Sequence, residues 1–109
     1  MKKKKYDIFK AIADPSRRKI IQLLFASGTL SITTLAADFQ QTRQAVTKHI
    51  SVLEKAGLVS IEEKGRERFC TAEFVPLKEV FDWVAFYENF WNKKLNSLEN
   101  YLKQNKKTK

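Results

Sequence analysis

Residues 30–59 read LSITTLAADFQQTRQAVTKHISVLEKAGLV and say most about the fold. The second half of this stretch repeats apolar residues at helical spacing, with Val46, Ile50 and Leu53 on one face. The other face of that segment is polar and carries no acidic residue before Glu54. An amphipathic helix of this kind, preceded across a short turn by a second helix, is the arrangement of a helix-turn-helix DNA reader.

Start and stop signals divide the chain into further helices. We expect helices at 6–13, 16–25, 33–39 and 43–56. Asp14, Ser31 and Thr42 are good N-cap residues, because their side-chain oxygens accept hydrogen bonds from the free N–H groups of a first turn. Gly28 and Gly57 follow helical segments as stops. The side chains expected to face inward from the second helix are Ile20, Ile21, Leu23 and Leu24.

A charged segment between two strand-like runs predicts a β-hairpin over 59–71. Val59 and Ile61 precede the charged residues, Phe69 and Cys70 follow them, and Gly65 marks the turn. A hairpin directly after a helix-turn-helix is a wing. The predicted fold is therefore mainly α with a small β-hairpin: a single winged helix-turn-helix domain over 1–109, with about five helices plus the wing. We expect the lone cysteine to be a small buried residue, and it excludes an intramolecular disulfide.

The last predicted helix is long, over 77–103, and carries two apolar stripes. The first stripe consists of Leu77, Val80, Val84, Tyr87, Trp91, Leu95, Leu98 and Leu102. The second stripe consists of Trp83, Phe86 and Phe90. A domain this small cannot cover both stripes, so we expect one to pack on its own core and the other on a partner subunit. A helix wrapped wholly within its own domain is the alternative.

The net charge of +9 is concentrated near the chain ends and says little about the fold. Lysines at 2–5, 103, 106, 107 and 109 supply eight of the positive charges. We expect basic tails, 1–5 and 104–109, to be flexible solvated ends, with a phosphate contact from the first tail as the alternative. The sequence contains no signal peptide and no apolar run of about 18 residues, so we expect a cytoplasmic protein without a membrane partner.

In this order the elements resemble those of the ArsR family of winged-helix bacterial repressors. The matching residues are Ala13-Asp14-Pro15-Ser16-Arg17-Arg18, Leu35-Ala36, Ala45-Val46-Thr47-Lys48-His49-Ile50, Leu53 and Ala56-Gly57-Leu58-Val59. The wing and the ending Phe86-Tyr87-Glu88-Asn89-Phe90-Trp91 are similar to the metal-free, autorepressor-like branch. The resemblance covers about residues 6–104. It implies a homodimer on an inverted repeat, with the 43–56 helix in the major groove and the 59–71 wing on the flanking backbone or minor groove.

The predicted contacts with double-stranded DNA lie on the fourth helix and the wing. They are Gln41, Thr42, Arg43, Gln44, Thr47, Lys48, His49, Lys64, Arg66 and Arg68. Arg43 and Gln44 suit guanine and adenine edges, and Thr47 and Lys48 suit a thymine methyl and a phosphate. For His49 the resemblance suggests a contact near the DNA backbone, and a structural histidine is the competing interpretation. Arg66 and Arg68 flank the wing tip, where a solvated hairpin is the alternative.

The resemblance also assigns the dimer contact to the first and last helices. The expected interface residues are Tyr6, Phe9, Val84, Tyr87, Phe90, Trp91, Leu95 and Leu98, and the sequence leaves open which stripe of the last helix faces the partner. Metal-sensing relatives place cysteines where this chain has Ser31 and Thr33. Those relatives also bind metal through their last helix. There, Asp82 of this chain matches one of their ligands, but Val84 stands where they have a histidine. One cysteine and one histidine cannot build a soft-metal site, so we expect no metal.

Two functions from different classes fit the sequence. The first is a sequence-specific, dimeric transcriptional repressor without cofactor or catalytic residues, and so not an enzyme, since no Ser-His-Asp or Cys-His constellation is suggested. The second is a winged-helix protein-interaction module that docks a partner through its aromatic C-terminal helix. The acid-free face of residues 41–48 favours the first. The sequence identifies no inducer, whether small molecule or protein.

Overall fold

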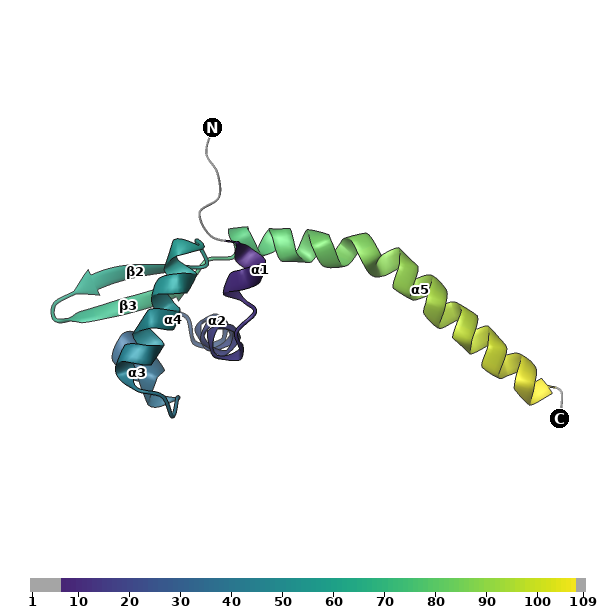
Figure 1. Cartoon of the computed structure of the whole chain (residues 1–109), viewed down its shortest axis with the longest axis horizontal. Coiled ribbons are helices and arrows are strands. Elements are labelled where there is room, and N and C mark those ends of the chain that lie inside the picture. Colours follow the sequence, from purple (N-terminus) through teal and green to yellow (C-terminus); the bar gives the residue numbers. More distant parts are fainter. Residues whose placement is uncertain (1–6, 108–109) are drawn as a thin grey trace, which may run out of the picture. The chain divides into compact units, whose positions relative to one another are not determined.

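The computed structural model describes residues 7–107, which fall into two units that meet in sequence at Lys78 (Figure 1). The first unit contains α1 (Ile8–Ala11), α2 (Pro15–Ser27), β1 (Leu30–Ser31), α3 (Ile32–Ala37), α4 (Arg43–Lys55), β2 (Val59–Lys64), β3 (Glu67–Ala72) and the 3-10 turn η1 (Val75–Leu77). The long helix α5 (Lys78–Lys107) forms the second unit from Glu79 onward. The prediction of a mainly helical winged helix-turn-helix with five helices is confirmed.

The predicted cap residues begin the helices. The Asp14 carboxylate accepts hydrogen bonds from the backbone N–H groups of Ser16 (2.7 Å) and Arg17 (3.3 Å) at the start of α2. Ser31 Oγ accepts from the N–H of Thr34 at the start of α3, and Thr42 Oγ1 accepts from the first turn of α4. Each such cap stabilises its helix by about 1 kcal/mol.

The boundaries of α1 to α4 differ from the predicted ones by up to two residues, for local reasons. α1 is shorter than predicted because Asp7 caps it just before Ile8, and the predicted start at Tyr6 lies outside the described residues. α2 runs two residues longer, until Gly28 adopts a φ of +84° and its N–H closes on the Leu24 carbonyl at 2.7 Å. That left-handed backbone is one that glycine adopts without strain.

The core of the first unit lies where α2, α3 and α4 meet the sheet. Its fully buried side chains include the α4 residues Val46, Ile50 and Leu53, as the helical spacing predicts. Ile20, Ile21 and Leu24 of α2 are also buried, but Leu23 is only half-buried, so its predicted inward position is wrong. At about 100° per residue, Ile20, Ile21 and Leu24 point within about 100° of one another around the helix, and Leu23 lies beyond the edge of that face.

A third strand, absent from the sequence prediction, completes the sheet. The strand order is β1-β3-β2 with both pairs antiparallel, and Leu30 of β1 lies opposite Cys70 of β3. β2 and β3 form the predicted hairpin, in which Lys64 pairs with Glu67 around Gly65, at a φ of +62°. Cys70 is fully buried, as predicted, and burial raises the pKa of its thiol to about 11.

α5 begins one residue later than predicted and continues four residues further, to Lys107. Residues 104–107, predicted as part of a flexible tail, are therefore helical; the predicted tail at 1–5 lies outside the described residues. The large apolar side chains of α5, considered as a unit by itself, are exposed from Phe81 to Leu102. Among the residues that the structure describes, no helix is both long and apolar enough to cross a membrane.

Candidate nucleic-acid interface

The outward face of α4 is open and polar. Arg43, Gln44, Thr47 and Lys48 line a shallow hollow of about 390 Å³ on this face. Thr47 is half-buried and the other three side chains are exposed. None of the four is acidic, so the hollow has the charge and the hydrogen-bonding groups that a phosphate-lined groove accepts.

Arg43 is held in position by the preceding helix. Its guanidinium donates a hydrogen bond of 2.7 Å from Nη1 to Thr33 Oγ1 on α3. A guanidinium carries five N–H donors, so this bond leaves others for the edge of a base. Thr33 stands at one of the positions where metal-sensing relatives are expected to have cysteine, and here it orients Arg43.

The turn between α3 and α4 is fastened to α2 by two side chains. Gln41, predicted to contact DNA, donates from Nε2 to Ser16 Oγ at 2.7 Å. Lys19 donates from Nζ to the Asp38 carbonyl at 2.9 Å and lies over the Phe39 ring, 4.7 Å from its centre. The sequence gives no local signal for the role of Lys19, because its partners lie about twenty residues away.

His49 lies on the flank of α4 that faces α2. Its Nδ1 is 3.2 Å from Nη1 of Arg17 on α2. The same guanidinium donates to the carbonyls of Ala11 (2.6 Å) and Lys10 (3.3 Å) at the end of α1. Arg17 therefore joins α1, α2 and α4, a role that the sequence did not indicate even though Arg17 belongs to the stretch that resembles the ArsR family.

Asp14 lies within electrostatic reach of this pair. Burial by itself raises the pKa of the Asp14 carboxyl, but the hydrogen bonds from Ser16 and Arg17 N–H and the electrostatic influence of His49 and Arg17 outweigh it. The net effect is a lowered pKa, because every one of these partners favours the charged carboxylate.

The wing carries its three basic residues in different directions. Arg66 lies in the exposed turn beside Gly65, and Lys64 Nζ lies 6.0 Å from the centre of the Phe69 ring. Arg68 lies opposite Glu63, one residue pair from the turn. It shares the face of β3 with buried Cys70, two residues along, because successive side chains of a strand point to opposite faces.

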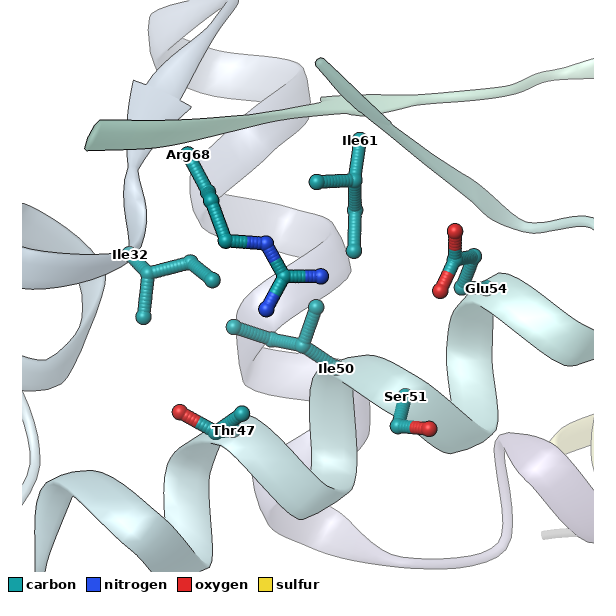
Figure 2. Close-up of a pocket in the computed structure, with 7 residues that line it drawn as sticks. All are labelled: Ile32, Thr47, Ile50, Ser51, Glu54, Ile61 and Arg68. Carbon is teal, nitrogen blue, oxygen red and sulfur yellow. The ribbon is translucent and has the colours of Figure 1, made fainter. Parts of the chain in front are cut away.

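Figure 2 shows the Arg68 side chain reaching from its strand toward α4, over Ile50 and Thr47. It lines a cavity of about 160 Å³ together with side chains of α3, α4 and β2, namely Ile32, Thr47, Ile50, Ser51, Glu54 and Ile61. The structure thus places Arg68 beside the recognition helix, whereas Arg66 remains at the turn of the wing.

The residues predicted for the dimer interface come from both units. Val84, Tyr87, Phe90, Trp91, Leu95 and Leu98 are each at least 41% exposed on α5. Trp83, Val84, Tyr87 and Trp91 line a hollow of about 370 Å³ on this helix. Phe9 is half-buried on α1, and Tyr6 lies outside the described residues.

Within the described range 7–107, no group of three or more His, Cys, Asp or Glu side chains is arranged to hold a metal ion. Ser31, which stands at the other position where cysteine is expected in metal-sensing relatives, is buried and caps α3.

A short helix pair across a turn, an open polar recognition helix and a following hairpin define the class of winged helix-turn-helix DNA-binding proteins. A family model described as a helix-turn-helix domain matches residues 12–62, which contain α2 to α4 and most of β2.

Relatives identify the family within this class. The chain is 32% identical over 92 residues to the transcriptional repressor SdpR of Bacillus subtilis, an alignment that covers 84% of this chain and 98% of the relative. It is 39% identical over 84 residues to the HTH-type transcriptional regulator YuzN of Bacillus subtilis, covering 71% and 91%. A crystal structure of an ArsR family transcriptional regulator, RHA00566, matches with a TM-score of 0.69 and 34% identity, covering 78% of this chain and 87% of the other. The chain belongs to the ArsR family, which is a family of transcriptional regulators rather than enzymes. It is a DNA-binding transcriptional regulator.

Proposed function

We propose that the protein is a repressor that binds an inverted-repeat operator as a homodimer, without a cofactor or metal. We propose that it acts in the cytoplasm. The observation that carries the proposal is the open, acid-free face of α4 formed by Arg43, Gln44, Thr47 and Lys48. The description of SdpR as a transcriptional repressor supports the direction of regulation.

Within this proposal, base reading and backbone contact belong to different residues. Arg43 and Gln44 begin the recognition helix, where base edges are reached, and their side chains suit guanine and adenine. Thr47 suits a thymine methyl. Lys48, Lys64 and Arg66 are assigned to phosphates, because all three are exposed cations. Lys48 lies on the polar face of α4, and the other two flank Gly65 at the turn of the wing.

The other predicted contacts have supporting roles that shape what they offer to DNA. Gln41 donates a hydrogen bond to Ser16, and Thr42 caps α4. Both residues therefore hold the start of the recognition helix in place. Arg68 approaches α4 from the sheet (Figure 2), so we assign it to a phosphate beside the recognition helix rather than beneath the wing tip.

The homodimer is supported by the exposed apolar side chains of α5. A helix of 30 residues with aromatic and aliphatic side chains exposed along most of its length is unlike the surface of a monomer. Two copies related by a two-fold axis would place their recognition helices on half-sites about 10 bp apart.

Selection of binding sites from random duplex DNA tests the proposal. We expect enrichment of an inverted repeat with half-site centres separated by about 10 bp or a multiple of it. Enrichment of a single, non-repeated site would contradict the dimeric mode of binding, and the absence of any enrichment would contradict sequence-specific binding.

The exposed aromatic side chains of α5 also favour a second candidate, a module that docks another protein. In that case the α4 face would be unused, and alanine at Arg43 and Gln44 would leave retention on mixed-sequence DNA unchanged as salt rises.

A further inference from the structure

The contact between Arg17 and His49 determines where the imidazole carries its proton. Arginine has only hydrogen-bond donors, so the 3.2 Å contact between Arg17 Nη1 and His49 Nδ1 requires that Nδ1 accept. A neutral imidazole has one N–H, and when Nδ1 accepts, that N–H is at Nε2. A ring protonated on both nitrogens would lose the contact, because two donors would then face each other.

The donor is fixed independently of the ring. Arg17 Nε donates to the Ala11 carbonyl at 2.6 Å, and Nη2 donates to the Lys10 carbonyl at 3.3 Å. These carbonyls lie in the last turn of α1, beyond the regular helical pairing, and the Lys10 carbonyl also accepts the Ala13 N–H at 3.2 Å. The guanidinium is planar and rigid, so bonding two of its nitrogens to α1 sets the direction of the third.

The carboxylate near this pair has its own partners. Asp14 lies within electrostatic reach of both Arg17 and His49, and its Oδ1 accepts the N–H groups of Ser16 and Arg17 at the start of α2. Asp14 therefore favours positive charge nearby, while the hydrogen bond to the ring nitrogen comes from Arg17.

His49 lies on α4 between its buried and its exposed faces. Ile50 and Leu53 are fully buried and Lys48 is exposed, while His49, between these two sides, is half-buried. With Nδ1 turned to Arg17, Nε2 is at the opposite edge of the ring. The flank of a recognition helix, rather than its centre, borders the DNA backbone, where the available acceptors are phosphate oxygens.

We propose that Arg17 holds His49 as the Nε2–H tautomer and that this N–H donates to a phosphate oxygen of bound DNA. Arg17 is then a positioning residue for a neutral, sequence-independent backbone contact. The phosphate contact rests on the proposed function, whereas the tautomer is a property of the free protein.

Nitrogen NMR of the untagged free protein tests the tautomer. The chain contains one histidine, so both ring-nitrogen signals belong to His49. At a pH where the ring is neutral, we expect the wild type to show the Nε2–H form alone and Arg17→Lys to show a mixture of both tautomers. Arg18→Lys is the matched control, since Arg18 donates to the Ile12 and Ala13 carbonyls instead. A mixture in the wild type, the Nδ1–H form, or an equal effect of both substitutions would overturn the assignment.

Two substitutions of His49 test the phosphate contact. The amide nitrogen of glutamine lies near the position of Nε2, whereas asparagine reaches only as far as Nδ1. At the same neutral-ring pH we expect His49→Gln to bind DNA within a few-fold of the wild type. We expect His49→Asn to lose roughly tenfold or more on operator and scrambled duplexes alike, as for a hydrogen bond to a charged group.

The salt dependence separates a neutral donor from a cation. Because a neutral N–H releases no counterion, the slope of log affinity against log salt should stay the same in His49→Asn. A slope smaller by about one unit per subunit would show a protonated ring, and equal affinities of the two variants would exclude the contact. Thermal unfolding of each variant identifies any loss caused by misfolding. If the wild type itself binds no duplex, the proposed function fails, while the NMR result still decides the tautomer.

Discussion

Replacement of Arg43 by alanine should weaken operator binding and relax the preference at one symmetric base position. Arg43 is exposed at the start of α4 and lines a hollow without acidic side chains. A bidentate arginine–guanine pair contributes about 1–3 kcal/mol of discrimination, which corresponds to roughly 5- to 150-fold for each half-site. Binding to scrambled DNA depends on phosphate contacts and should fall much less.

The structure adds a contribution that can be measured separately. The 2.7 Å bond from Arg43 to Thr33 Oγ1 orders the guanidinium before DNA arrives. An arginine side chain has about 2 kcal/mol of rotamer entropy to lose, and the bond removes part of that cost from the binding step. Thr33→Val keeps the arginine and the shape of residue 33 but removes the acceptor. We expect it to weaken operator binding by roughly two- to fivefold without changing base preference.

The assay is a titration of wild type, Arg43→Ala, Thr33→Val and Lys48→Ala against operator and scrambled duplexes at several salt concentrations. Lys48→Ala, the phosphate comparison, should lose affinity about equally on both duplexes and lower the salt slope by about one unit per contact. Equal weakening of both duplexes by Arg43→Ala would refute base reading by this residue. A loss in Thr33→Val as large as that in Arg43→Ala would place the effect in the Thr33 bond instead.

Three further outcomes are expected. In sedimentation at micromolar concentration the wild type should form a species near twice 12.7 kDa. Trp91→Ala should weaken association, since truncation of a tryptophan buried in the interface costs about 3–5 kcal/mol, and Lys93→Ala, on the polar face of α5, is the control. Asp14→Ala should lower the free energy of unfolding by about 1 kcal/mol. Because the pKa of Asp14 is lowered in the folded protein, the stability that its carboxylate contributes should be present above pH 3.8 and be lost as the pH falls through the lowered pKa. Cys70, whose pKa is raised from 9.0 to about 11, should react with thiol reagents only as the protein unfolds, and rapid labelling of the native protein at pH 9 would contradict its burial. The free energy of unfolding should fall between pH 9 and 11, because the thiol of the unfolded chain releases its proton first.

Features that depend on neighbours within a few residues could be predicted from the sequence. The caps at Asp14, Ser31 and Thr42 bond to N–H groups two or three positions along the chain, so residue type and spacing were enough to predict them. The buried face of α4 follows from the 3.6-residue helical period in the same way, and Gly65 marks the turn of the hairpin.

Contacts that join distant segments depend on how the chain packs in three dimensions. β1 is two residues long and shows no alternation of its own, and it exists as a strand because β3 pairs with it some forty residues later. The direction of Arg68 follows from the burial of Cys70 on the same strand face, which fixes the register of the whole hairpin. Arg17 and His49 are 32 positions apart, and packing of α2 against α4 brings them together. Helical periods and cap signals specify which side chains share a face, but the partner of a side chain 32 positions away is set only when the hydrophobic core packs those faces together.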